Sequence, residues 1–450
     1  MLSIQPFKRR IVRVLFVAIA ALATLPGGVA RADTLANQGN LPYPFSFGLV
    51  RATAIADTAN IYLFGGLNGW GIWGSITRFN PSTGAFTSMS ASLSPARQGA
   101  SGIYDGSNFY LFGGYRPLGG GQATDLIAKY NAASDSATSI GAKLPKPKAH
   151  SSAIWTGRYA FIFGGGNGNW DDTGAGSSDI YRFDPVTESI ATMTAHLPVA
   201  VAGSSAVWDG TYAYIAGGST NTTGGTSRAI MRYNPTTDTA SLLPQRLPYA
   251  VADAASFWNG QDMIVAGGLT SHNSSGNYYY TTSIQRFTPS TGVVGYMKQT
   301  ISERSGMFGT WFGGAAWLFG GQRYACMDNG YGGCTTEVYM YSDVFRYTME
   351  PGPPGGVFAY PNGLGSNLVS WNTPDYTTYT SSLTSYRIYR YEYLPYGSTA
   401  LRRIAEVPAN YGNYYVDTQC PLGALCEYTV SAVNVFGESP KTSYGYSVGT

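Results

Sequence analysis

The stretch IYLFGG, Ile61 to Gly66, consists of four apolar or aromatic residues followed by two glycines. The chain repeats it as FYLFGG, AFIFGG, AYIAGG, MIVAGG and AWLFGG, which begin at Phe109, Ala160, Ala213, Met263 and Ala316. The first glycines of consecutive pairs lie 48 to 53 residues apart. A period of this length is typical of a β-propeller, in which each repeat forms one four-stranded sheet.

Each repeat except the sixth also contains the signals of three further strands. A second short strand precedes the apolar one and is joined to it by a turn such as Asp105-Gly106, where glycine supplies the positive φ that a tight hairpin requires. Two more strands follow the glycines. Because the apolar strand does not alternate with polar residues, we expect both of its faces to be buried between neighbouring sheets.

The apolar strand with its Gly-Gly pair, the period, and the aromatic residue of the third strand resemble kelch repeats, as in the central domain of galactose oxidase. The resemblance covers residues 34–348. The tryptophan usual in the fourth strand of kelch repeats is replaced by Phe86 or smaller residues. The resemblance implies an all-β fold, a six-bladed kelch-type β-propeller over residues 33–348.

The sixth repeat lacks a fourth strand, because prolines follow DVFRYTMEPGPP. The N-terminal segment TLANQGNLPYP, from Thr34, parallels the fourth strands of other repeats. We therefore expect residues 34–40 to pair with the strand at Val344 to Tyr347 and to close the propeller.

A Pro/Gly linker at residues 349–356 precedes a change of pattern. Residues 357–450 alternate apolar and polar positions at strand length, which predicts an antiparallel β-sandwich. The segment resembles a fibronectin type III domain, with Trp371 on its second strand and Tyr428 at the position of the tyrosine corner. Such modules serve most often as spacers or adhesive elements.

Residues 1–32 have the pattern of a cleaved export signal. A basic start containing Lys8 and Arg13 precedes an apolar core from Val14 to Leu25 and an A-x-A ending. The alternative, a membrane anchor, is disfavoured because the core is short for a membrane span of about 20 residues. We expect a secreted, periplasmic or cell-surface protein without a membrane span once the signal is removed.

Removal of the signal takes away five positive charges and no negative ones, which changes the formal net charge from +3 to −2. The sequence therefore gives no global indication of nucleic-acid binding. Charged residues make up only 12% of the chain, about half of the roughly 25% usual in globular proteins.

The four cysteines form two close pairs, Cys326 with Cys334 and Cys420 with Cys426. In an exported protein this predicts two local disulfides. A metal site is the alternative, but the spacing does not fit one and no histidine follows His272. We expect no metal and no other cofactor.

The loops between the second and third strands are long and variable, which is typical of binding loops on a rigid scaffold. In an antiparallel sheet they emerge at the same end as the connections from each fourth strand to the next repeat. Exposed aromatic side chains among Asn, Gly and Ser suit stacking on sugars or protein contacts; the alternative is that they pack on one another. These residues are Trp70, Trp73, Trp170, Tyr278, Tyr279, Tyr280, Tyr324 and Tyr331.

Basic residues lie at the same end of the repeats. Arg97, Lys148 and Arg304 occupy the position sixteen residues before a Gly-Gly pair, and Arg51 lies two residues beyond that position in the first repeat. They predict an off-centre basic patch that could bind a carboxylate. The alternative is ordinary ion pairing with nearby acidic residues.

These patterns favour a non-catalytic protein that binds a glycan or an extracellular protein through the aromatic loops. The alternative from the resemblance is a periplasmic epimerase or mutarotase of sialate-like sugar acids, to which the repeat number, export signal and basic patch are similar. A copper-radical oxidase of galactose oxidase type is disfavoured, because residues 349–450 contain no histidine to bind copper.

Overall fold

The structure is a computed structural model that describes residues 34–42, 44–116, 122–167, 176–220, 225–272, 278–328, 334–348, 354–363, 365–374, 383–393, 399–420, 425–434, 437–439, 441–442 and 445–448. The predicted export signal lies outside these residues. The described chain is built from β-strands, which confirms the all-β prediction. It divides into two compact units, one mainly Asn37–Phe312 with Ala316–Phe345 and the other mainly from Arg346 onward.

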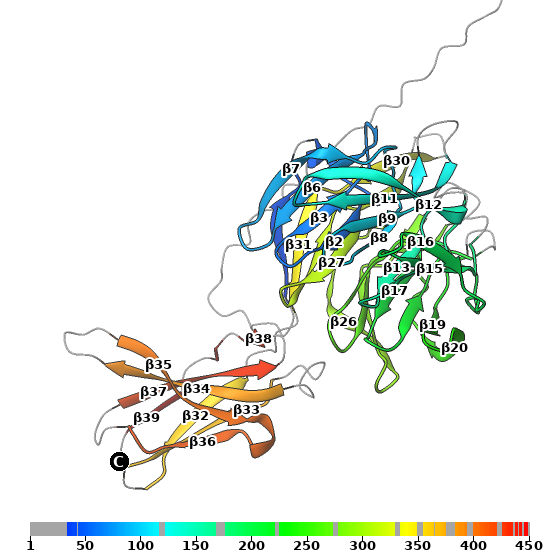
Figure 1. The fold of residues 1–450 in the computed structure, drawn as a ribbon. Coiled ribbons are helices and arrows are strands. Elements are labelled where there is room, and N and C mark those ends of the chain that lie inside the picture. The colour runs from blue at the N-terminus through cyan, green and yellow to red at the C-terminus, as the bar shows by residue number, and fades with distance from the viewer. Residues whose placement is uncertain are drawn as a thin grey trace, which may run out of the picture. The chain divides into compact units, whose positions relative to one another are not determined.

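The described part of the first unit contains six larger antiparallel sheets, which follow one another along the chain (Figure 1). The first is β2 (Thr53–Ala56), β3 (Ile61–Phe64), β6 (Ser75–Asn80) and β7 (Ala85–Ser92). The second is β8 (Ser101–Tyr104), β9 (Phe109–Phe112), β11 (Gln122–Asn131) and β12 (Ser136–Lys148), with β10 (Tyr115–Arg116) also paired to β11. The third is β13 (Ser152–Trp155), β14 (Ala160–Phe163), β15 (Ile180–Asp184) and β16 (Ser189–Thr192).

The remaining sheets repeat this order. The fourth is β17 (Ser205–Trp208), β18 (Ala213–Ala216), β19 (Ala229–Asn234) and β20 (Thr239–Arg246). The fifth is β21 (Ala255–Trp258), β22 (Met263–Ala266), β25 (Ser283–Thr288) and β26 (Val293–Thr300). The sixth is β27 (Phe308–Phe312), β28 (Ala315–Phe319), β31 (Asp343–Thr348) and β1 (Thr34–Asn40).

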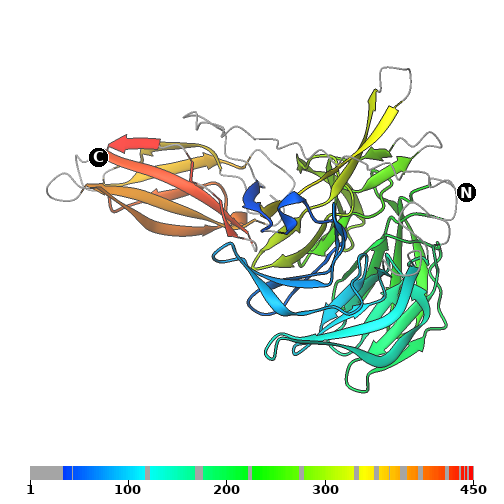
Figure 2. The ribbon, with the colours of Figure 1, turned by 90° about the horizontal axis from the view of Figure 1, so that it is seen from above.

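The first strands of the sheets are neighbours in space. In the order β2, β8, β13, β17, β21 and β27 each contacts the next, and β27 contacts β2. Figure 2 shows the sheets of the first unit from above, coloured from blue to yellow along the chain. The apolar second strands are buried along their whole length in all six sheets, as their sequence predicted. Their side chains fill apolar clusters between adjacent sheets; one such cluster joins Phe64 of the first sheet to Phe109 and Tyr130 of the second.

The N-terminal strand β1 pairs with β31, the strand pairing predicted for residues 34–40. Just beyond β1, the Leu41 amide donates a hydrogen bond to the Ser342 carbonyl at 2.7 Å. The sixth sheet therefore combines the start of the described chain with the end of the first unit.

The Gly-Gly pairs bring consecutive sheets together. The Gly66 amide donates to the Arg97 carbonyl oxygen at 3.0 Å, and a Cβ atom on Gly65 would collide with that same oxygen. Gly65 also has a φ of 63°, in the left-handed region that favours glycine. Because Arg97 belongs to the connection into the next sheet, no larger residue fits here without moving two sheets apart.

The second unit has two sheets that share one apolar core. One sheet is β32 (Gly355–Pro361), β33 (Asn367–Asn372) and β36 (Tyr414–Asp417). The other is β34 (Leu383–Tyr393), β35 (Thr399–Pro408), β37 (Leu425–Asn434), β38 (Gly437–Glu438) and β39 (Gly445–Val448). Trp371 of β33 packs on Tyr386 of β34, with ring centroids 5.2 Å apart.

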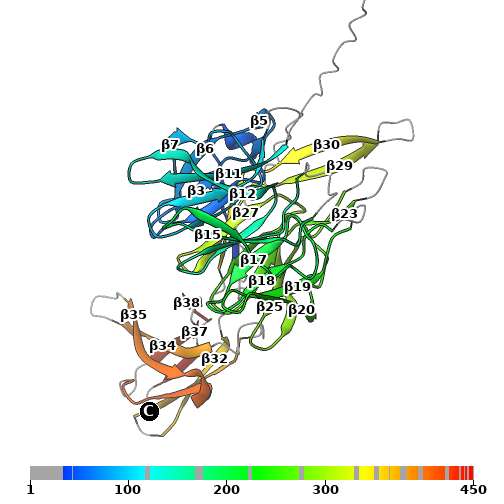
Figure 3. The same ribbon diagram turned by 45° about the vertical axis from the view of Figure 1, so that its right-hand side comes forward.

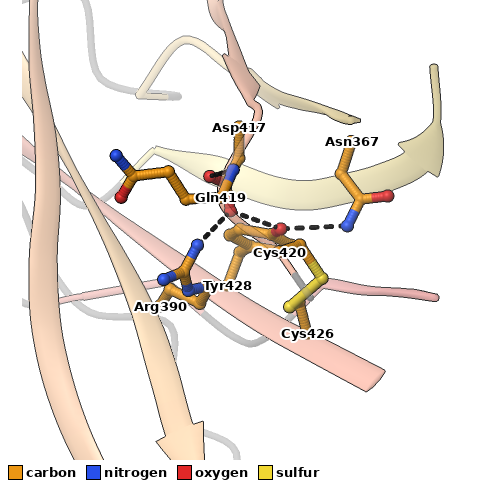
Figure 4. Close-up of a disulfide and its surroundings, with 7 residues drawn as sticks. All are labelled: Asn367, Arg390, Asp417, Gln419, Cys420, Cys426 and Tyr428. Atoms are coloured by element: carbon orange, nitrogen blue, oxygen red, sulfur yellow. Dashed lines mark hydrogen bonds and ion pairs between the residues drawn. A yellow bond between two sulfur atoms is a disulfide. The ribbon is translucent and has the colours of Figure 1, made fainter. Parts of the chain in front are cut away.

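A buried polar network and a disulfide fasten this unit (Figure 4). The Tyr428 hydroxyl donates to Asp417 Oδ2 at 2.8 Å, and it accepts from Nδ2 of the Asn367 side chain at 3.0 Å. Arg390 donates to the same carboxylate at 2.7 Å. The predicted disulfide between Cys420 and Cys426 is confirmed. The side chains of Cys326 and Cys334 lie outside what the structure describes, so their disulfide stays a prediction.

No helix among the described residues has the length and apolar character that crossing a membrane requires.

Candidate functional site at the loop end of the sheets

The Gly-Gly pairs, the long loops and the connections between repeats lie at one end of the six sheets, called here the loop end. Backbone bridges pair a residue of each connection with the first residues of a loop, as between Val50 and Leu67 or between Ala252 and Leu269. The two kinds of segment therefore emerge together, as the antiparallel strand order requires.

Two hairpins at the loop end bring tyrosines together. One hairpin is β23 (Leu269–His272) with β24 (Tyr278–Tyr280), and the other is β29 (Gln322–Asp328) with β30 (Cys334–Met340) (Figure 3). Tyr324 lies 4.8 Å from Tyr278 between ring centroids, and its amide donates to the Tyr280 hydroxyl at 2.9 Å. Tyr279, between them, is 51% exposed.

The tryptophans of the first loop differ in exposure. The loop forms a short hairpin of β4 (Leu67–Asn68) and β5 (Gly71–Ile72). Trp73 donates its indole N–H to Asn68 at 2.7 Å and packs on Phe45, whereas Trp70 is 58% exposed. Trp73 therefore serves the loop core, and Trp70 faces solvent. Trp170 and Tyr331 lie outside the described residues.

Two of the four predicted basic residues are buried and bound by backbone groups. Arg97 donates to the Pro95, Gly113 and Leu126 carbonyls at 3.1 to 3.2 Å. Arg304 donates to the Gly320 carbonyl at 3.0 Å and forms an ion pair with Asp343 at 3.0 Å. These guanidinium groups bind the connections to the sheets. They are buried, whereas the sequence predicted that they would be exposed.

The other two basic residues are also buried in ion pairs. Lys148 lies 3.1 Å from Asp179, and burial lowers the pKa of its amine. Arg51 Nε donates to Asp253 Oδ2 at 3.0 Å, and Oδ1 of the same carboxylate lies 3.4 Å from His150 Nδ1. Internal ion pairing, the alternative to an exposed basic patch, thus describes these side chains better.

Arg51 belongs to a ring of six residues that the six connections bring together, called here the backbone ring. Each ring residue donates its amide to the carbonyl of the ring residue in the preceding repeat, at 2.7 to 2.9 Å, and Arg51 donates to Gly306. The members are Arg51, Gly99, His150, Gly203, Asp253 and Gly306.

All six ring residues have a φ between 51° and 63°, in the left-handed region. Glycine adopts this conformation without strain, but three ring positions carry side chains instead. Each of these uses the space beside a neighbouring glycine, since a Cβ on Gly203 would lie 2.5 Å from Asp253 Oδ1 and one on Gly99 would lie 2.9 Å from His150 Cε1. The alternation of glycine with Arg, His and Asp lets the three side chains meet.

The contacts of Asp253 with Arg51 and His150 were not predicted from the sequence. A common position in the repeat could have indicated that they lie together, because all six ring residues stand fourteen positions before the first glycine of a Gly-Gly pair. Burial by itself would raise the pKa of Asp253, but the neighbouring Arg51 and His150 hold it well below the usual range.

A second missed residue is Arg116, at the end of β10. Among the described residues, neither Nη2 of Arg97 nor Nε of Arg116 has a hydrogen-bond partner. Burial, followed by the charge of Arg116, lowers the pKa of Arg97 to about 10. A buried guanidinium beside a second cation is the type of arrangement that an anion stabilises. The described side chains offer no cluster of three or more His, Cys, Asp or Glu suited to hold a metal ion.

The chain is similar in fold to a solved structure described as "Structure of YjhT". The likeness has a TM-score of 0.52 and covers 65% of this chain and 94% of that chain, at 17% sequence identity. Together with the strand content, it fits a β-propeller. No protein-family model and no curated protein sequence matches the chain.

Proposed function

We propose that this chain is an exported, non-catalytic protein that binds a glycan through the loop end of a closed, six-bladed kelch-type propeller. In this proposal β1 closes the propeller, and residues 357–450 are a fibronectin type III-like module. The cyclic contacts of the first strands and the β1–β31 pairing support the closed six-bladed arrangement.

The exposed aromatic side chains of the loop hairpins carry the proposal. Tyr279 and Trp70 present large apolar rings to solvent beside polar loop residues, and such rings stack on the apolar faces of sugars. The contacts of Tyr324 with Tyr278 and Tyr280 hold one hairpin against the other, so the ring of Tyr279 is displayed from a supported segment.

The charge of the ligand follows from Arg97 and Arg116. Their unpaired nitrogen atoms lie at the loop end, and Arg116 is only partly buried. A carboxylate on the ligand would bind the guanidinium of Arg116 and so offset its repulsion with the buried Arg97. We therefore infer that the glycan is acidic.

A glycan array probed with the mature chain tests this function. We expect binding to acidic glycans, and we expect it to be lost in Trp70→Ala or Tyr279→Ala and weakened in Arg116→Ala. Tyr296→Ala is the matched control, because Tyr296 is 64% exposed on the outer strand β26. Binding that is restricted to proteins, or glycan binding that all three loop variants retain, would contradict the proposal.

An acidic glycan ligand is also consistent with a second candidate function, that of a sugar-acid epimerase or mutarotase. The two neighbouring guanidinium groups of Arg97 and Arg116 support this function, because they favour a sugar acid as the ligand. Proton NMR of N-acetylneuraminate with the mature chain separates the two functions. A catalyst accelerates the exchange of anomers, whereas a binding protein only broadens or shifts the ligand signals.

A further inference from the structure

Three cavities lie end to end along the first strands of the six sheets. The innermost, of about 120 Å³, is lined by the backbone ring and the residues that follow it. It shares Ala52, Ala100 and Ser204 with a chamber of about 460 Å³. The chamber shares Trp155 and Trp311 with an outer cavity of about 210 Å³. The chamber volume lies within the roughly 300–1,000 Å³ usual for small-molecule sites.

The outer cavity is lined by indole rings. Trp155, Trp208, Trp258 and Trp311 all occupy the position nine residues before the first glycine of their repeats, where the first strand approaches the end away from the loops. All four are partly exposed. Their common position turns four large aromatic side chains toward one opening.

Hydroxyl groups line the chamber between this opening and the backbone ring. Thr53 donates to the Ala100 carbonyl at 2.7 Å, and the Ser101 hydroxyl lies 2.9 Å from that of Ser151, which lines the inner cavity. Ser152, from the third sheet, also lines the chamber. Each hydroxyl has one donor and two acceptor positions, so these groups keep capacity to bind a ligand.

The inner cavity ends on a buried acceptor. The His150 side chain is 10% exposed and lines this cavity, and among the described residues its Nε2 has no hydrogen-bond partner. In the neutral ring, a proton on Nδ1 faces Asp253 and leaves Nε2 as an acceptor for a hydroxyl donor. An unpaired polar atom at this depth favours a bound group that supplies the missing hydrogen bond.

The described residues that line the three cavities carry no net charge when His150 is neutral. Among the described lining residues, Arg51 and Asp253 are the only charged side chains, and they pair with each other at 3.0 Å. A ligand that fits therefore has no strong charge, many hydroxyls and an apolar ring face. A single neutral sugar has all three properties.

We propose that these cavities form a site for a neutral monosaccharide or cyclic polyol, separate from the loop-end site. One sugar hydroxyl donates to His150 Nε2, other hydroxyls bond to the chamber wall, and the ring stacks on an indole at the opening. The ligand enters at the end of the sheets that carries the tryptophans.

NMR of the histidine side chains of the mature chain tests the proposal. The chain has 3 histidines, so the Cε1–Hε1 signal of His150 is assigned by its loss in His150→Asn. Asparagine tolerates the left-handed conformation that His150 adopts, with φ 55°, so this variant keeps the backbone ring. The probes are glucose, galactose, mannose and myo-inositol, each titrated to its solubility limit.

We expect at least one probe to shift the His150 signal saturably while the signals of His196 and His272 stay in place. Trp208→Ala should weaken that binding about tenfold through lost stacking, and Trp70→Ala at the loop end should leave it unchanged. The absence of a saturable His150 shift with all four probes would overturn the proposal. Sugar binding lost in Trp70→Ala but kept in Trp208→Ala would also overturn it, while supporting the loop-end function.

Discussion

Replacing Asp253 by glycine separates two opposite effects at the backbone ring. The change gives this position the residue that three other ring positions carry, and it removes the strain of a left-handed aspartate, roughly 1 kcal/mol. It also removes the carboxylate that pairs with Arg51, whose side chain is only 4% exposed. Leaving a buried charge without its partner costs about 3 kcal/mol, at the lower end of the usual range since Asp253 is 19% exposed.

We therefore expect Asp253→Gly to lower the free energy of unfolding by about 2 kcal/mol. The double variant Arg51→Gly/Asp253→Gly removes both charges and both strained residues, and its stability should return close to that of the wild type. The double-mutant cycle should give a coupling energy of about 3 kcal/mol.

Urea unfolding followed by tryptophan fluorescence measures these differences. All tryptophans except Trp371 lie before residue 349, so the signal reports mainly the first unit. Glu188→Gly is the matched control, because Glu188 has a φ of 48° and a partly exposed ion pair with Lys129. It should leave stability unchanged or raise it slightly. If Asp253→Gly leaves the free energy of unfolding unchanged or raises it, as expected for the control, then the Arg51–Asp253 ion pair does not stabilise the backbone ring and the prediction is wrong.

Four further predictions concern pH, the buried arginine and the second unit. The depressed pKa of Asp253 contributes stability that is present above about pH 4 and lost as the pH falls, so the stability advantage of the wild type over Asp253→Asn should shrink between about pH 5 and pH 3 in urea titrations. Arg97→Ala should lower the free energy of unfolding of the first unit by about 3 kcal/mol, because the carbonyls of Gly113 and Leu126 lose the hydrogen-bond donor that the buried Arg97 supplies. A decrease of less than about 0.5 kcal/mol would mean that these hydrogen bonds contribute little to stability. Tyr428→Phe should cost about 1–3 kcal/mol, measured by the thermal unfolding of the second unit, because Asp417 and Asn367 lose a buried partner. Reduction of the Cys420–Cys426 bond should cost about 2 kcal/mol by calorimetry, since the closed loop spans a separation of only 6 residues.

The repeat pattern was sufficient to predict the strands, because in five of the six sheets all four strands lie within one repeat. The burial of Phe109 to Phe112 and the pairing of β1 with β31 both follow from that pattern. The ion-pair partners of the basic side chains could not be predicted from the repeat pattern. Arg304 meets Asp343 across 39 residues and Arg51 meets Asp253 across 202, so their partners are set by how sheets pack.

The opening with the tryptophans was missed for a different reason. Long variable loops predict binding at the loop end. The four tryptophans of the opening lie on short, regular strands instead: Trp155, Trp208, Trp258 and Trp311. Their repetition at one position of the repeat was visible in the sequence. From the sequence alone, a tryptophan repeated in four sheets suggests a packing role. The outer cavity that these four side chains line is the observation that indicates a binding role.

Native-state hydrogen exchange of the backbone ring tests most directly whether the six sheets form a closed propeller. The six ring amides lie outside the strands, where exchange is ordinarily fast. The closed ring predicts that all six exchange slowly and at similar rates, including Arg51 and Gly306, whose bond joins the first repeat to the last. Fast exchange at Arg51 with protection at the other five would show that the ring is open between the first and sixth sheets.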